Sequence, residues 1–344
     1  MGIILFSSYA LILCIMSFFS KKQTTSQDVF FVNARSTSSN AIAISIVTSS
    51  IGASATIGVI GLAFEVGMPA FWWLGSGALG LIVLGCCFAN KIRASKAYTL
   101  SEIIASLLGK NAEFLSAIII VFAWTAIVTS QLAACIFLLQ ALLGVNKLIA
   151  LLLGCSLIAM HTVLGGQGSI IRLDKFQVNL IIGGILALLI WGILYSPTTF
   201  QHIDFELVNN YFPLDKAFYF CLILGGSYIV CPMLYGRVLC ANDEKTASHG
   251  VLLAAFLLAI MALAITIIGI YARGVVPPGT PADDVLITFI SIALHPWLAK
   301  FIYLFLLCTV ISSADSCLFA ASSALSRHLL KLDSINAIVI VLYF

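Results

Sequence analysis

A stripe of hydroxyl groups runs along the apolar segment 298–321, and oxygen atoms of this kind could hold a cation. At about 100° per residue of an α-helix, its members fall within an arc of about 100°. They are Thr309, Ser312, Ser313, Ser316 and Ser323. Their neutral oxygens suit a hard monovalent ion held loosely enough to be released. Because the stripe has no imidazole or thiolate, zinc and copper are poor candidates.

A second polar stretch, "TSSIGASATIG" (residues 48–58), interrupts another apolar segment with glycines. Unwound backbone at membrane depth is tolerated only where it lines a cavity or is buried in protein. It would add free carbonyl oxygens to the hydroxyl stripe, and the two together would suit Na⁺. The alternative is structural, because serine and threonine hydroxyls also bond to carbonyls of their own helix or lie at close helix contacts.

The composition indicates that these segments lie in a membrane. The chain has 344 residues, 61% hydrophobic and only 9% charged, whereas soluble domains carry about 25% charged residues. The apolar runs are continuous rather than alternating, which favours membrane helices over a β-barrel. The ten cysteines lie in or beside apolar segments and are interpreted as buried hydrophobic residues. A net charge of +3 is too weak to indicate a nucleic-acid partner.

The sequence predicts an all-α, polytopic protein of the lipid bilayer with nine spans. They are 2–19, 40–64, 68–89, 112–144, 148–166, 178–195, 217–239, 249–272 and 298–321. The first span lacks a cleavage signal and is followed by Lys21 and Lys22, so we expect an outside N-terminus. This topology places 13 Lys and Arg residues inside and 4 outside, as the positive-inside rule requires. We expect a plasma (inner) membrane location.

The seventh span also carries an interrupted polar stretch, "LGGSYIVCP" (224–232), five helices after the first one. Because five is odd, a repeated five-helix unit re-enters the membrane inverted, and paired broken helices mark the midplane site of such transporters. We therefore expect one transmembrane domain, 1–344, with an extra N-terminal helix (2–19), a first repeat (40–195) and an incomplete second repeat (217–344). Residues 335–344 begin a tenth helix too short to cross, which predicts a truncated product or a fragment.

Four motifs, in this order, resemble the sodium:solute symporter family over residues 26–331. They are "SQDVFFVNARS" (26–36), "GGQGSIIRLDKFQ" (165–177), "PMLYGRVLCANDEKTASHG" (232–250) and "SSADSCLFAASSALSRHLLK" (312–331). The resemblance implies a LeuT-type inverted-repeat fold and Na⁺-coupled uptake, with Na⁺ as coupling ion and no other cofactor. It implies a sodium site between spans two and nine, formed by backbone oxygens of Thr48 and Ile51, the Thr309 carbonyl and the hydroxyls of Ser312 and Ser313.

The resemblance also implies that the solute lies against the two helix breaks. The candidate contacts are Ser50, Ser54, Thr56, Tyr228 and Pro232. Tyr228 could instead be an aromatic packed at a helix contact. The chain departs from the proline branch at Ser50 and Leu224, and it lacks the polar residues of the sugar branch after the break. A small organic solute of amino-acid, carboxylate, vitamin or sugar type is therefore the expected partner.

Asp174, in the motif before the sixth span, is implied to act in sodium exit or gating. Its alternative is a solvated loop acid paired with Arg172 or Lys175.

The sequence also bears on other classes of function. A membrane enzyme is disfavoured because the spans hold no HxxxH or DxxD pair. A transporter-like sensor domain and a non-functional truncated remnant stay open as alternatives, and the sequence carries no sign of the oligomeric state.

Overall fold

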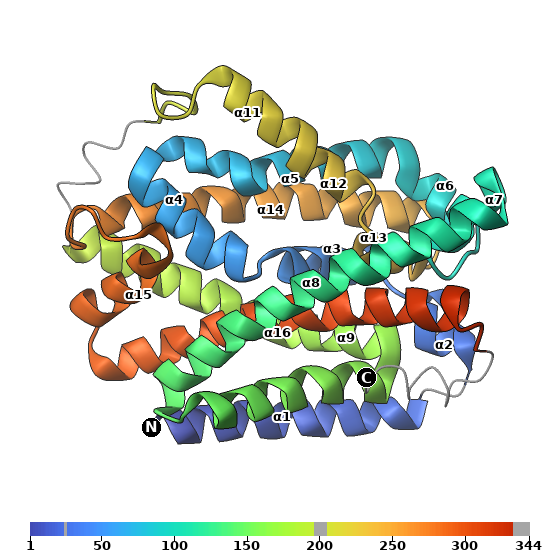
Figure 1. Cartoon of the computed structure of the whole chain (residues 1–344), viewed down its shortest axis with the longest axis horizontal. Helices are drawn as coiled ribbons and strands as arrows, with labels where there is room; N and C mark the ends of the chain where they lie inside the picture. Colours follow the sequence, from blue (N-terminus) through green and yellow to red (C-terminus); the bar gives the residue numbers. More distant parts are fainter. Residues whose placement is uncertain (24–25, 196–204, 333–344) are drawn as a thin grey trace.

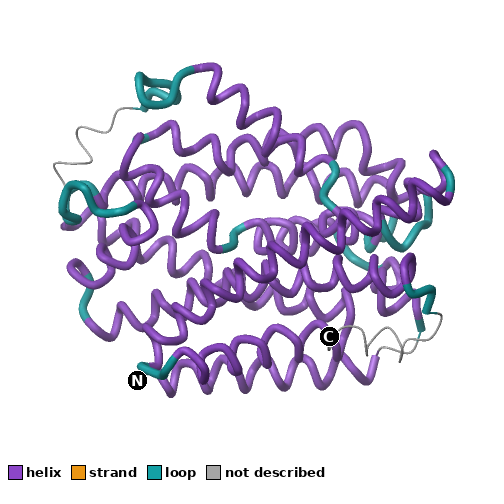
Figure 2. Tube along the Cα trace, in the orientation of Figure 1, coloured by secondary structure: helices purple, strands orange, loops and turns teal. Residues whose placement is uncertain are grey.

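The computed structural model describes residues 1–23, 26–195 and 205–332, and these are almost entirely helical (Figures 1 and 2). The helices are α1 (Gly2–Gln23), α2 (Gln27–Val32), α3 (Ser39–Ser50), α4 (Val59–Val66), α5 (Trp72–Val83), α6 (Ala89–Ala94), α7 (Leu100–Leu108), α8 (Lys110–Leu143), α9 (Lys147–Tyr195), α11 (Leu214–Phe220), α12 (Gly226–Ile229), α13 (Pro232–Leu239), α14 (Glu244–Ala272), α15 (Ala282–Ala293) and α16 (Pro296–Ala324). The short helical turns are η1 (Asn33–Arg35), η2 (Ser54–Gly58), η3 (Met68–Phe71), η4 (Leu84–Phe88), η5 (Cys221–Gly225) and η6 (Leu325–Leu329). The all-α prediction is confirmed.

Among the described residues, six helices are long and apolar enough to cross a membrane, or up to eight if each bent pair is one span. Most predicted spans coincide with these within a few residues. The predicted fifth span, 148–166, corresponds to the first part of α9, which is helical from Lys147 to the turn at Gly166. The predicted start of a tenth helix, 335–344, lies outside the described residues.

Both predicted breaks are present, and each bends a span sharply. Ser39–Ser50 and Ser54–Val66 meet at 71°, and Ile51 leaves helical geometry at φ −95°, ψ 80°. Leu214–Ile229 and Pro232–Leu239 meet at 44°. Pro232 is the first residue of α13, where the missing proline N–H interrupts no helical hydrogen bond. The first break therefore frees backbone groups in the interior of the molecule, at the buried Ile51, whereas Val230 at the second break is exposed.

The non-helical connection expected between the fifth span (148–166) and the sixth (178–195) is wrong, because residues 166–177 are helical. The chain turns at Gly166, with φ 58° and ψ −157°, and then runs as one helix to Leu194. A Cβ atom at Gly166 would collide with the Phe30 carbonyl, so only glycine fits this turn. The polar residues of this segment, such as Gln167 and Gln177, are buried.

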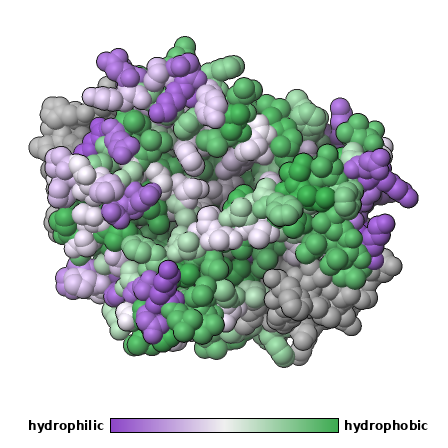
Figure 3. All heavy atoms as spheres, in the orientation of Figure 1, coloured by the Kyte–Doolittle hydropathy of each residue, from purple (hydrophilic) through white to green (hydrophobic). Residues whose placement is uncertain are grey.

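Helix α16 lies in the centre of the fold and α8 crosses it (Figure 1). Of the span that ends with η6, 89% is buried, against 11% for α8. The outward face of α8 carries large apolar side chains such as Phe122 and Leu115. Hydrophilic residues gather at the two ends of the molecule in Figure 3, with mostly hydrophobic residues between them. This distribution is that of an integral, multi-pass membrane protein.

Candidate ion and solute site

The break after α3 and the hydroxyl stripe of α16 are in direct contact. The Ser313 hydroxyl donates a hydrogen bond of 2.8 Å to the Ser49 carbonyl, in the last turn of α3. The hydroxyls of Ser49 and Ser316 lie 2.9 Å apart, and all three residues are buried. The stripe therefore faces the broken helix, as the periodicity predicts.

The five residues proposed to hold sodium lie around this contact. Thr48 and Ile51 are fully buried, and the Thr48 hydroxyl has no hydrogen-bond partner among the described residues. The Thr309 hydroxyl donates to the Leu306 carbonyl at 2.7 Å, so this side chain is already satisfied within its own helix. The site thus gathers uncharged oxygens from two helices that are remote in sequence. Whether these oxygens bind sodium stays a prediction.

Asp174 is buried, with 1% of its surface exposed, so the interpretation as a solvated loop acid is wrong. Its carboxylate accepts hydrogen bonds from Ser312, at 2.6 Å, and from Ser45. Its partner of opposite charge is Arg237, 3.7 Å away, rather than Arg172 or Lys175. Asp174 therefore contacts one of the predicted sodium ligands directly.

Arg237 is the charged centre of this network and was missed by the sequence analysis, which counted it as a charge of an inside connection. Its guanidinium donates to Ser45 at 3.1 Å, to Ser49 at 3.0 Å and to Ser316 at 2.5 Å. Its exposed fraction is 1%. Through Arg237 and Asp174, the network joins α3, α9, α13 and α16 beside the proposed sodium ligands. The opposite charges of the pair balance, so the site has no net fixed charge.

A cavity of about 350 Å³ opens beside the α3 break, between α5, α8, α12 and α16. Of the predicted solute contacts, it is lined by Ser50, Ser54 and Tyr228. The Ser50 hydroxyl donates to the Ile46 carbonyl at 2.7 Å. A Cβ atom at Gly77 would lie 2.8 Å from the Tyr228 ring, so this tyrosine is also packed closely against α5.

Two predicted solute contacts do not line this cavity. The Thr56 hydroxyl turns back to the Gly52 carbonyl at 2.9 Å. Pro232 lines a separate, narrow cavity of about 30 Å³, between the Arg237 network and Tyr98. Both residues stabilise or shape the broken helices, and neither side chain faces the larger cavity.

Two lining residues on α8, Gln131 and Trp124, were not predicted. The Gln131 side-chain oxygen accepts the backbone N–H of Ala53 at 3.1 Å, so it satisfies a donor that the break exposes. The available signal was a carboxamide in the middle of the apolar run 112–144, where an unpaired polar group is costly.

The cavity widens toward the α15 end of the molecule and is closed toward the α7 end. An opening of about 770 Å³ shares Ser54, Trp73 and Ser130 with the cavity and reaches Asp283 and Asp284 at the start of α15. The cavity of about 30 Å³ lies on the opposite side of the Arg237 network.

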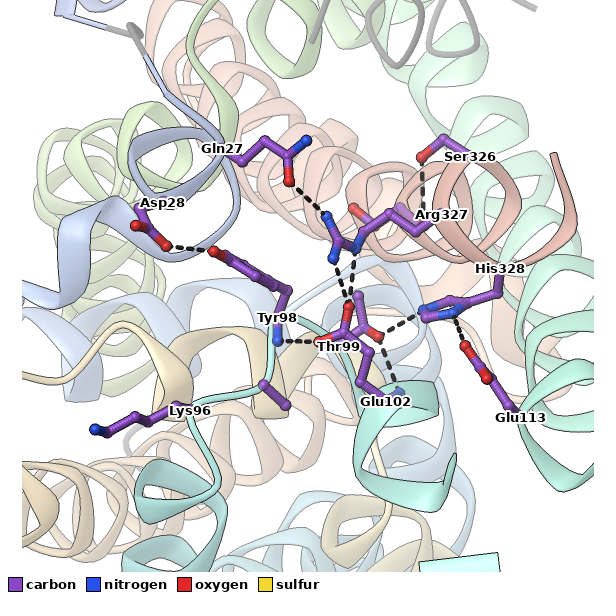
Figure 4. Close-up of polar contacts among 12 residues, drawn as sticks. Gln27, Asp28, Lys96, Tyr98, Thr99, Glu102, Glu113, Ser326, Arg327 and His328 are labelled. Atoms are coloured by element: carbon purple, nitrogen blue, oxygen red, sulfur yellow. Dashed lines mark hydrogen bonds and ion pairs between the residues drawn. The ribbon is translucent and has the colours of Figure 1, made fainter. Parts of the chain in front are cut away.

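A cluster of charged and polar side chains closes the α7 end (Figure 4). Arg327 donates to Glu102 at 2.7 and 2.9 Å, and its guanidinium lies over the Tyr98 ring at 4.5 Å. His328 lies 2.6 Å from Glu113 and 2.7 Å from the Thr99 hydroxyl. These contacts fasten η6, at the end of the stripe-bearing helix, to α7 and α8. We call this cluster the α7 latch, and its members are Tyr98, Thr99, Glu102, Glu113, Arg327 and His328.

A broken helix facing a hydroxyl stripe beside a cavity deep in the bundle is the arrangement of a secondary transporter with inverted repeats. A solved structure shares this fold: a Na⁺-coupled sialic acid symporter, in a substrate-bound outward-open state, superposes with a TM-score of 0.86. The alignment covers 99% of this chain and 78% of that one at 14% identity. The LeuT-type fold is thereby confirmed.

The sequence pattern of the sodium:solute symporter family matches residues 30–332, so the chain belongs to this family. It is 26% identical over 322 residues to the sodium/pantothenate symporter of Haemophilus influenzae and 24% identical to that of Escherichia coli. It is 28% identical over 191 residues to the human sodium/myo-inositol cotransporter, covering 54% of this chain and 26% of the relative. The two pantothenate symporters match 87% of this chain, which spans 65% of their length.

Proposed function

We propose that this protein carries a small organic solute across the plasma membrane together with Na⁺, by alternating access. Family membership supports this activity, as do the symporters among its relatives. The contact that carries the proposal is the Ser313–Ser49 hydrogen bond, because it brings the α16 stripe against the α3 break. We place the α15 end and the N-terminus outside, following the distribution of Lys and Arg.

In the proposed cycle, Na⁺ enters from the α15 end and replaces direct hydrogen bonds between the two helices. The hydroxyls of Ser312 and Ser313 turn to the ion, as do backbone oxygens of Thr48, Ile51 and Thr309. Because the ion binds α3 to α16, it fixes the break and shapes the neighbouring solute cavity. Binding of the first ligand therefore prepares the site for the second, which is the basis of coupling.

Release requires the α7 end to open. The α7 latch closes that end here, while the cavity reaches the opposite side, so the described arrangement is outward-facing. Asp174 lies between the Ser312 hydroxyl and the narrow cavity that Arg237 and Ser316 line. We propose that its carboxylate receives the ion when it leaves the neutral oxygens, which is the exit role that the family resemblance implies.

The coupling energy is sufficient for useful accumulation. One charge that moves through 100 mV releases about 2.3 kcal/mol, and a tenfold inward sodium gradient adds about 1.4 kcal/mol. The total of about 3.7 kcal/mol would support up to several-hundredfold accumulation of an uncharged solute.

The proposal is tested by uptake of radiolabelled pantothenate and myo-inositol into proteoliposomes that contain the purified chain. We expect an inward Na⁺ gradient to drive uptake of at least one of them above its K⁺ control. Equal uptake in Na⁺ and K⁺ for both solutes would reject sodium coupling. Na⁺-dependent binding with no uptake would instead favour the alternative of a transporter-like sensor.

A further inference from the structure

The solute cavity beside the α3 break holds no charged side chain among its described lining residues. Its polar lining consists of Ser49, Ser50, Ser54, Ser130, Ser227 and Ser313, with Trp73, Trp124, Gln131 and Tyr228. The buried charges Asp174 and Arg237 are paired with each other and are not among the lining residues of this cavity. The acids Glu65, Asp283 and Asp284 line the outer opening instead. A charged solute in the cavity would therefore meet no side chain of opposite charge.

Trp124 brings an unused hydrogen-bond donor to this cavity. Its indole lines the cavity, and its Nε1–H is buried without a partner among the described residues. A buried donor left without a partner costs free energy that a bound acceptor would recover. The indole nitrogen has no acceptor role, so it can recognise only an oxygen or nitrogen lone pair on the solute.

Gln131 brings a second donor to the same face of α8. Its side-chain oxygen accepts the hydrogen bond from the Ala53 N–H, so the amide nitrogen is the end that can face the solute. The amide nitrogen carries the two N–H donors of this side chain. Trp124 and Gln131 are seven residues apart, so they lie on one helix face about two turns, or roughly 10 Å, apart.

We propose that the cavity selects an uncharged, polar solute with acceptor oxygens at both ends, such as a polyol, a sugar or a hydroxylated amide. Trp124 and Gln131 are its specificity-determining donors, and the serine hydroxyls complete the contacts along its length. This assignment rests on the proposed function and names its solute class. Amines are disfavoured because burying a charge without a paired group is costly. A carboxylate is disfavoured because no lining side chain pairs with it, and its only counter-charge would be the Na⁺ proposed at Ser313.

The size of the cavity agrees with such a solute. About 350 Å³ corresponds to roughly a dozen water molecules at about 30 Å³ each. A ring or chain of that many heavy atoms would reach from Trp124 to Gln131. The volume lies at the lower end of the range for small-molecule sites, about 300–1,000 Å³.

The test is thermal stabilisation of the purified full chain in Na⁺ and in K⁺ by three panels of compounds at equal concentration. The uncharged panel is myo-inositol, glucose and nicotinamide, the anionic panel is pantothenate, lactate and N-acetylneuraminate, and the cationic panel is choline and spermidine. We expect the largest Na⁺-dependent shift from an uncharged compound. A larger shift from a charged compound, or no Na⁺-dependent shift from the uncharged panel, would overturn the proposal.

Two variants test the assigned donors with the best uncharged compound. Trp124→Phe removes the indole N–H together with part of the ring system, and Gln131→Glu keeps the acceptor for Ala53 but replaces the donor. Each should weaken binding about tenfold, the effect of one lost hydrogen bond. Trp297→Phe is the matched control, because this indole is exposed and outside the cavity. Unchanged binding in both cavity variants would refute their role.

The failure of this inference is distinguishable from the failure of symport. Uncharged compounds that bind but are not taken up would reject transport and leave the solute class intact. Na⁺-driven uptake of an anion in preference to every uncharged compound would support symport and reject the solute class.

Discussion

The Ser313 hydroxyl donates a 2.8 Å hydrogen bond to the Ser49 carbonyl across 264 positions of sequence. Ser49 precedes the bend of 71° that interrupts its span, and Ser313 lies on the most buried helix of the described fold. The Ser49 carbonyl oxygen of one helix and the Ser313 hydroxyl of the other thus lie within hydrogen-bond distance of each other. A cation placed there would hold the same two helices together through both oxygens.

Replacing the hydroxyl of Ser312 or of Ser313 in the proposed sodium site should weaken sodium binding. Ser312→Ala and Ser313→Ala each remove one oxygen, so the Na⁺ concentration for half-maximal uptake should rise more than tenfold. The measurement is solute uptake against Na⁺ concentration in proteoliposomes. An unchanged sodium requirement in both variants would count against the assigned ligands.

Thr309→Val tests whether Thr309 binds sodium through its backbone carbonyl or through its side-chain hydroxyl. Its hydroxyl already donates to Leu306, and only its carbonyl is proposed to face the ion. The sodium requirement should therefore change by less than about twofold. A change as large as that of Ser313→Ala would show that the Thr309 hydroxyl itself binds the ion.

Removing Asp174 should destabilise the protein, because it leaves the Arg237 charge buried and unpaired. Asp174→Asn should cost about 3–5 kcal/mol, seen as a lower unfolding temperature in detergent. Combining it with Arg237→Met should cost less than the two single changes together. Asp215→Asn, at an exposed acid, is the control and should have no effect. Strict additivity in the double variant would contradict a direct pair.

Weakening the α7 latch should open that end of the molecule. Glu102→Gln removes the charge that holds Arg327, so a cysteine introduced at Ser323, in the narrow cavity, should react several-fold faster with a thiol reagent. The experiment should use a variant chain in which the exposed native cysteines are replaced, so that only the introduced cysteine reacts. Glu244→Gln, at an acid outside the latch, is the control. Equal labelling rates with and without Glu102→Gln would show that the latch does not close this path.

The close contact between Gly80 on α5 and Gly225, in the second broken span, can be tested by substitution. A Cβ atom at Gly80 on α5 would collide with the Gly225 carbonyl, whereas one at Gly226 would meet nothing within 4 Å. Gly80→Ala should therefore lower stability by about 1–3 kcal/mol. Gly226→Ala should leave it unchanged or slightly raised. Similar unfolding temperatures for the two variants would contradict the close approach of the helices.

The sequence was sufficient for the parts of the fold that depend on local patterns. Continuous apolar runs indicated the spans, and glycine and proline marked both breaks. The helical period of 3.6 residues was enough to align Ser312, Ser313 and Ser316 on one face, and the structure places that face against α3. These features depend on neighbouring residues in one helix, so no tertiary information was needed.

The parts that were missed depend on contacts between distant segments. A buried arginine looks like a loop charge until its partners are known, and those of Arg237 come from α3, α9 and α16. The polar segment 166–177 was taken as a loop for the same reason, since its polar residues face protein rather than water. Gln131 has a role only because the α3 break exposes the Ala53 N–H beside it.

The most direct measurement is an experimental structure of the chain determined in Na⁺ and again in K⁺. We predict density for a cation, in Na⁺ only, coordinated by the Ser313 hydroxyl and by backbone oxygens at the end of α3. The direct hydrogen bond between Ser313 and the Ser49 carbonyl should then lengthen or break. A bond that persists at saturating Na⁺, with no cation between the two helices, would contradict the account.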